Sequence, residues 1–152
     1  MTVRAVRGQR LGLRGLDHPQ PRLAAPRRLA WLYCGPVRLT LELTLPDPAR
    51  RCAGWAILPR AGGPRPGLAL QQALYAAGFG TLSVDLLNET EARQPATAFD
   101  TARLAGRLLA ATRWLAQRPE ARGRRLSYLA AGPSAGAALR AAAELGSLIA
   151  GI

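Results

Sequence analysis

The sequence contains no lysine, a single histidine (His18), two cysteines and few aromatic residues among its 152 positions. The two cysteines, Cys34 and Cys52, are too few for a disulfide framework, and neither lies in the CxxC or Cys/His spacing typical of a zinc site. No apolar run approaches the roughly 18 to 20 residues that cross a membrane. We therefore predict one globular cytoplasmic domain without a metal, a cofactor or a membrane span.

All basic residues are arginines, and they outnumber the acidic residues 21 to 9, which gives a net charge of +12. Together with the excess of Ala, Gly, Pro and Leu, the lack of lysine indicates compositional bias from a GC-rich genome. The first 28 residues carry seven arginines and one acid, Asp17, and the other arginines are scattered. Specific nucleic-acid binding is disfavoured because stacking aromatics are scarce, while weak electrostatic binding through the Arg-rich N-terminus stays an alternative.

The chain divides at about residue 36. Residues 1–36 contain four prolines and no sustained hydrophobic period, which predicts a basic leader or loop. Residues 37–152 alternate between strand and helix patterns. We expect strands over residues 38–45, 54–58, 79–87 and 125–131, and helices over 66–78, 97–118 and 135–149.

Local signals support these helices and the fold class that they imply. Pro66 and Gly78 lie where the first helix would begin and end, and Thr97-x-x-Asp100 resembles a capping box before the second. The first strand alternates apolar and polar residues, as an antiparallel edge strand does. Helical crossovers between the later strands predict an α/β protein with an open, mostly parallel sheet and helices on both faces.

One motif carries chemistry, Gly132-Pro133-Ser134-Ala135-Gly136, between the last predicted strand and the last helix. It matches G-x-S-x-G, in which a sharp strand-to-helix turn exposes a nucleophilic serine and the glycines avoid collisions with neighbouring elements. We therefore predict Ser134 as nucleophile and the backbone N–H of Ala135 as an oxyanion donor. A helix-capping serine between two turn glycines is the alternative. A dinucleotide-binding turn is a weaker alternative, because its first glycine and its later acidic residue are missing.

Beyond this motif, the chain from about Val37 onward resembles the α/β-hydrolases, in particular the dienelactone-hydrolase-like branch, over the N-terminal half of their fold. The resemblance rests on residues 41–46 (LELTLP), 77–91 (AGFGTLSVDLLNETE), Phe99-Asp100, 107–112 (RLLAAT), 114–120 (WLAQRPE) and the GPSAG motif. It implies hydrolysis of small carboxylic esters or lactones by Ser134. It also implies an oxyanion donor in the loop that begins at Arg60 and Ala61, where relatives usually have a His-Gly pair.

The acid and histidine of that family follow later strands, whereas His18 precedes the first predicted strand. We expect the chain to be truncated or degenerate and nearly inactive alone, with Ser134→Ala changing little; a non-catalytic interaction module is the alternative. Weaker candidates are Asp85, interpreted as a solvated or capping carboxylate, Glu89 and Glu91, interpreted as a solvated loop, and Trp114, expected to stack on arginine. The strand at 125–131 would be an exposed sheet edge and favour self-association.

Overall fold

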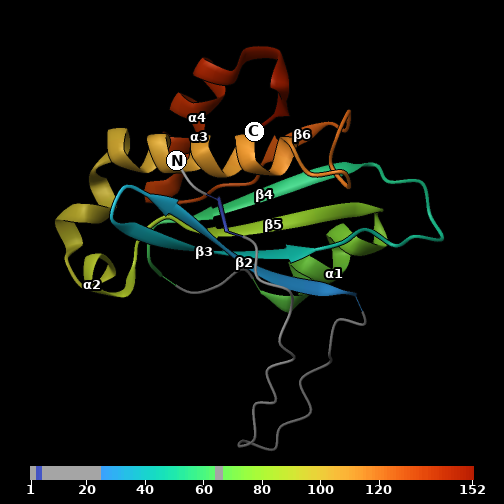
Figure 1. Ribbon diagram of the computed structural model, residues 1–152, viewed down its shortest axis with the longest axis horizontal. Helices are drawn as coiled ribbons and strands as arrows, with labels where there is room; N and C mark the ends of the chain where they lie inside the picture. The colour runs from blue at the N-terminus through green and yellow to red at the C-terminus, as the bar shows by residue number, and fades with distance from the viewer. Residues whose placement is uncertain (1–2, 5–24, 64–66) are drawn as a thin grey trace, which may run out of the picture.

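The computed structural model describes residues 3–4, 25–63 and 67–152 (Figure 1). Within these ranges, seven strands form one open sheet in the order β1-β2-β3-β5-β4-β6-β7. The strands are β1 (Val3–Arg4), β2 (Arg27–Cys34), β3 (Val37–Thr44), β4 (Gly54–Arg60), β5 (Phe79–Asp85), β6 (Leu126–Tyr128) and β7 (Ile149–Gly151). The helices are α1 (Leu68–Ala76), α2 (Glu89–Ala92), α3 (Thr101–Ala116) and α4 (Pro133–Leu145), with 3₁₀ turns η1 (Pro95–Phe99) and η2 (Gly146–Leu148).

The half of the sheet that contains β4 to β7 is parallel. Strand β4 pairs in parallel with β5 on one side and with β6 on the other, and β6 pairs in parallel with β7. Six of the seven residues of β4 are buried, as expected for a central strand covered on both faces. Helices α3 and α4 lie over one face of the sheet and α1 lies against the other (Figure 1). The predicted α/β class and open sheet are confirmed.

The N-terminal part of the sheet corrects the prediction that residues 1–36 are leader or loop. Strand β2 pairs antiparallel with β3 along its whole length, and the two-residue turn between them contains Gly35, whose φ is +62°. A glycine with positive φ followed by proline suits the tight turn of a hairpin. Strand β3 is also antiparallel to β5, so it lies inside the sheet and is not the predicted edge. Most of the predicted leader, with His18, lies outside the described residues.

The helix boundaries differ from the prediction in three places. Residue Asp100 caps α3 by accepting a hydrogen bond from the backbone N–H of Arg103, and Thr97 lies in η1, so the Thr97–Asp100 capping box is wrong. A capping box is present at α2 instead, between Asn88 and Glu91. The last helix ends at Leu145 and not at residue 149, because the chain turns at Gly146 and continues into β7. The predicted helix start at Pro66 lies outside the described residues.

Strand β6 is not the predicted sheet edge, because β7 pairs with it. The core lies between the sheet and helices α3 and α4. It contains Trp55 and Ile57 of β4, Leu82 of β5 and Leu108 of α3, all with no exposed surface. On β6, Tyr128 is 2% exposed, and its hydroxyl lies 2.7 Å from Thr112 Oγ1 of α3. This contact fixes the end of β6, from which the chain enters the candidate site.

Candidate active site

A pocket of about 570 Å³ lies where β4 and β6 reach their C-terminal ends. Its walls come from the end of β4 with the loop after it, from the segment that follows β6, and from one residue of α1. They are residues 58–63, residues 129–134 and Leu70. The carboxyl ends of parallel strands are where α/β sheets usually place ligands. The structure thus brings together both segments in which the sequence predicted site residues.

The sharp turn between β6 and α4 is at Gly132. Its φ of 57° and ψ of −138° lie in a region that residues with side chains rarely adopt. No other group lies within 4 Å of the position that a Cβ atom would take there, so a side chain at residue 132 would meet open space. In a nucleophile elbow the reactive serine occupies such a strained, exposed strand-to-helix turn. The residue with this strained geometry at the turn is Gly132, which has no side chain.

Ser134 is the second residue of α4 and is only 2% exposed. Its hydroxyl donates a hydrogen bond to the backbone carbonyl of Ala131, with Oγ and O 2.8 Å apart. The expectation of an exposed serine at the turn is therefore wrong. The G-x-S-x-G pattern is present, but its serine lies two residues beyond the turn, where it belongs to the first turn of the helix.

The oxyanion donor expected at the elbow is already engaged in a hydrogen bond. The N–H of Ala135 already donates to the carbonyl of Gly132, with the two atoms 3.0 Å apart. In a nucleophile elbow the donor is the N–H of the residue after the turn residue. That residue is Pro133, which has no N–H. Proline at the first helical position was the signal in the sequence that could have placed the turn at Gly132.

The other elbow glycine, Gly136, has a packing role. A Cβ atom added there would lie 3.4 Å from Cγ2 of Thr101, so Gly136 allows α4 to approach the start of α3 closely. The sequence predicted that the glycines of the motif avoid collisions with neighbouring elements, and Gly136 does so. The glycine therefore positions the helix rather than a reacting atom.

The predicted oxyanion loop at Arg60 and Ala61 does line the pocket, but its charge is engaged. Both Nε and Nη2 of Arg60 lie 2.6 Å from Oδ1 of Asp85, the facing residue at the end of β5. Nη1 of Arg60 donates to the carbonyl of Gly63 at 2.9 Å. Asp85 is thus an ion-pair partner, and not the solvated or capping carboxylate predicted from the sequence. The pair holds the loop at residues 60–63 in place as one wall of the pocket.

Two other titratable groups have shifted acidity because they are buried. Burial raises the pKa of Tyr128, and the hydrogen bond with Thr112 opposes this only in part. Burial likewise raises the pKa of the Cys34 thiol, opposed by the positive charge of Arg107. Neither group is among the residues that line the pocket. Among the described residues there is no group of three or more His, Cys, Asp or Glu side chains that could hold a metal ion.

This fold is that of the α/β-hydrolases. The dienelactone hydrolase of Anabaena variabilis superposes with a TM-score of 0.68 and 28% identity, covering 82% of this chain and 60% of that protein. A dienelactone hydrolase-like promiscuous phosphotriesterase from metagenomic libraries superposes with a TM-score of 0.64 and 20% identity, covering 83% of this chain and 56% of that protein. A serine hydrolase of Xanthomonas campestris superposes with a TM-score of 0.58 and 22% identity, covering 84% of this chain and 61% of that protein. The chain thus resembles the dienelactone-hydrolase-like branch and has part of its fold.

Among curated proteins, two relatives from Mycobacterium tuberculosis strains, each named "Putative phosphoribosyl transferase", are 38% identical over 116 residues. The match covers 74% of this chain and 26% of each relative, so the chain spans about a quarter of their length. No family model matches the chain. None of the helices in the described ranges is both long and apolar enough to cross a bilayer.

Proposed function

We propose that the chain binds a small, largely apolar molecule, such as an ester or a lactone, in the elbow pocket and does not hydrolyse it. The observation that carries this proposal is the pair Gly132-Pro133, which occupies the turn between β6 and α4. Glycine supplies no nucleophile at the turn, and proline supplies no N–H where an oxyanion would need one. In this proposal the chain is a degenerate member of a hydrolase lineage and acts as a binding module.

The composition of the pocket favours a ligand of low polarity. Its walls include apolar side chains from β4 (Leu58), α1 (Leu70) and the segment after β6 (Leu129). The one charged side chain in its described lining, Arg60, is already paired with Asp85. A neutral molecule with one or two carbonyl oxygens suits these walls, because apolar pockets with few polar groups bind such ligands. Phosphoribosyl transfer, named for the curated relatives, gains no specific support from this lining.

The competing function is ester or lactone hydrolysis with Ser134 as nucleophile. Ser134 belongs to the pocket wall, but its hydroxyl would have to leave its hydrogen bond with the Ala131 carbonyl, and a base would have to remove its proton. The only histidine of the sequence is His18, which lies outside the described residues. We therefore expect turnover of activated esters close to the uncatalysed rate, unchanged in Ser134→Ala.

The test is to titrate γ-valerolactone and phenyl acetate into the ¹⁵N-labelled chain and to follow its amide resonances and the ligands together. We expect saturable shifts at Gly62, Gly63 and Gly132, with the lactone ring intact afterwards. Leu70→Trp should abolish the shifts by filling the pocket. The matched control Leu139→Trp, on an exposed position of α4, should preserve them. Turnover that Ser134→Ala abolishes, or covalent labelling of Ser134 by a fluorophosphonate, would contradict the proposal.

A further inference from the structure

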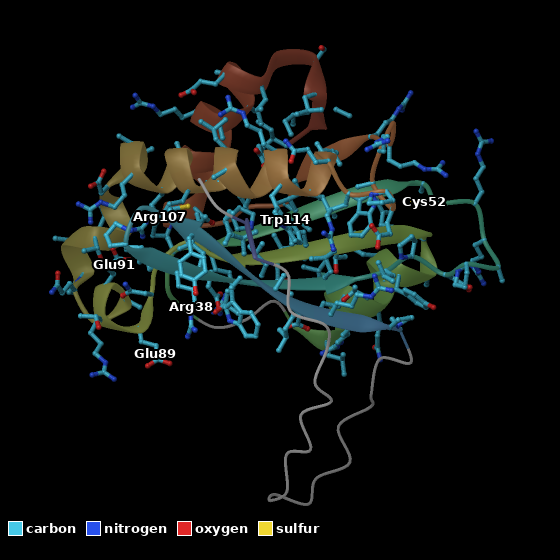
Figure 2. All side chains as sticks on the ribbon, in the orientation of Figure 1. Arg38, Cys52, Glu89, Glu91, Arg107 and Trp114 are labelled. Atoms are coloured by element: carbon cyan, nitrogen blue, oxygen red, sulfur yellow. The ribbon has the colours of Figure 1, made fainter. Side chains whose placement is uncertain are left out.

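The end of the sheet opposite the pocket is formed by two loops. Residues 45–53 precede β4 and residues 117–125 precede β6, so both loops lie at the N-terminal ends of parallel strands. The N–H of Trp55 donates to the carbonyl of Arg125 at 2.8 Å, and its indole Nε1 donates to the carbonyl of Glu120 at 3.3 Å. A Cβ at Gly54 would lie only 2.9 Å from the Arg125 carbonyl oxygen. The two loops are therefore held side by side, at the end marked by Cys52 in Figure 2.

These loops and the start of β2 carry a concentration of positive charge, which we call the arginine pole. Its members are Arg28, Arg50, Arg51, Arg118, Arg122, Arg124 and Arg125. Two carboxylates lie among them: Glu120 pairs with Arg28 at 3.0 Å, and Asp47 pairs with Arg50 at 3.6 Å. Within the described ranges, Arg51, Arg122, Arg124 and Arg125 are exposed and form no salt bridge.

We propose that the arginine pole binds the phosphodiester backbone of double-stranded nucleic acid without reading its sequence. Exposed guanidinium groups present forked donors that match phosphate oxygens, and unpaired ones have no carboxylate to release first. In the part of the chain that the structure describes, the aromatic side chain stacked against the pole's arginines is Trp114, which is 4% exposed and lies beneath Arg118 at 4.9 Å. It cannot stack on bases, so the surface offers contacts to the backbone rather than to unpaired bases.

An anionic membrane is the less suitable partner for this surface. Peripheral membrane binding usually combines basic residues with apolar side chains that enter the lipid. No large apolar side chain of the described parts of loops 45–53 and 117–125 is exposed. The proposal is independent of the pocket, which lies at the other ends of the same strands.

The test measures binding of the full chain to a short, fluorescein-labelled duplex DNA of mixed sequence by fluorescence anisotropy at several salt concentrations. The variant Arg122→Gln/Arg124→Gln/Arg125→Gln should bind about tenfold more weakly or worse near 0.1 M salt. Its log–log salt slope should fall by about 0.9 for each phosphate that the variant no longer neutralises. The control Arg38→Gln/Arg93→Gln/Arg140→Gln removes the same charge from exposed positions outside the pole. It should change the affinity less than about twofold, since only long-range charge is removed.

A second variant keeps the proposal testable if three glutamines disturb the loops. Arg122→Lys/Arg124→Lys/Arg125→Lys keeps the charge, and it should retain most of the duplex binding because backbone binding depends mainly on charge. Equal weakening in the glutamine variant and its control would overturn the proposal in favour of overall charge. Tighter binding to phosphatidylglycerol vesicles than to DNA, abolished in the same variant, would overturn it in favour of a membrane surface.

Discussion

Among the described residues, Arg107 is the one charged residue that is buried, and it connects three elements. Its Nη1 donates to the carbonyl of Leu86, just after β5, and to Oε2 of Glu91, both at 2.7 Å. Its Nη2 donates to Oε1 of Glu91, also at 2.7 Å. Figure 2 shows the two side chains pointing toward one another from α3 and α2. A bidentate pair of this kind fixes orientation as well as charge.

We predict that Glu91→Gln lowers the free energy of unfolding by about 1 to 3 kcal/mol, because Arg107 then keeps a buried charge with a weaker partner. Equilibrium urea unfolding near neutral pH measures the effect. The matched control is Glu89→Gln, an exposed position in the same short helix, which should stay within about 0.5 kcal/mol of wild type.

The same pair predicts a pH dependence. The hydrogen bonds from Arg107 lower the pKa of Glu91, whereas burial raises it. The hydrogen bond from the N–H of Asn88 and the positive charges of Arg107 and Arg103 lower this pKa further. A carboxyl group whose pKa is lower in the folded than in the unfolded protein stabilises the fold at pH values above the unfolded-state pKa. This stabilisation is lost as the pH falls through the folded-state pKa. The stability difference between wild type and Glu91→Gln should therefore shrink as the pH falls below the usual glutamate value. A difference that is constant through the acid range would contradict this assignment.

At single residues, sequence reasoning succeeded where the partner is a near neighbour in the chain. Trp114 was expected to stack on arginine, and Arg118, one helical turn later, lies over its ring. Glu91 was interpreted as solvated because its partner, Arg107, belongs to another helix and only the tertiary fold brings them together. Ser134 was misplaced for another reason. The motif fixes residue types but not the position of the turn, which Gly132 and Pro133 determine.

Among the elements, the central strands and the two long helices follow from hydrophobic period, whereas β2 and β7 do not. Strand β2 buries only Ala30 and Leu32, and its flanking arginines and prolines resemble a loop. Strand β7 has three residues, too few for a period, so that the alanine-rich helix pattern seemed to continue through it. Both strands depend on pairing with a neighbouring strand, which a single sequence does not reveal.

Two glycines inside these elements should respond in opposite directions to alanine. A Cβ at Gly80, in β5, would lie 2.7 Å from ring atom Cδ2 of the fully buried Trp55. Gly80→Ala should therefore lower the free energy of unfolding by about 1 to 3 kcal/mol through overpacking. Gly106 of α3 has no group within 4 Å of the position that a Cβ atom would take. Gly106→Ala should therefore raise the free energy of unfolding by up to about 1 kcal/mol, because alanine has the higher helix propensity. Thermal or urea unfolding of both variants provides the measurement, and equal signs would contradict this account of the packing.

Across the whole molecule, the two ends of the parallel strands differ in chemistry. The pocket end has apolar walls and one charged side chain in its described lining, whereas the opposite end carries the arginine pole. Both proposals therefore concern separate surfaces of one sheet. Substitutions more than about 7 to 10 Å apart that share no partners act nearly additively. We expect Leu70→Trp to leave duplex binding unchanged and the pole variant to leave lactone binding unchanged.

Self-association through the sheet edge stays a prediction, but the edge is now β7 and not β6. Two of the three residues of β7 are exposed, and next to it Leu148 and Ile152 are 37% and 60% exposed. An unpaired edge with apolar neighbours favours association, while the net charge of +12 opposes it. Because salt screens this repulsion, association should increase with ionic strength, the opposite of the expected DNA binding.

Sedimentation velocity at low and high protein concentration, with and without added salt, measures this association. Ile152→Lys should reduce it by placing a charge beside β7. The control Tyr33→Lys changes an exposed position of β2, toward the end of the strand order opposite to β7, and should leave the association unchanged. If both variants behave alike, the charge itself and not the β7 edge governs association. A monomer at every concentration and salt level would show that a three-residue edge is too short to pair with another chain.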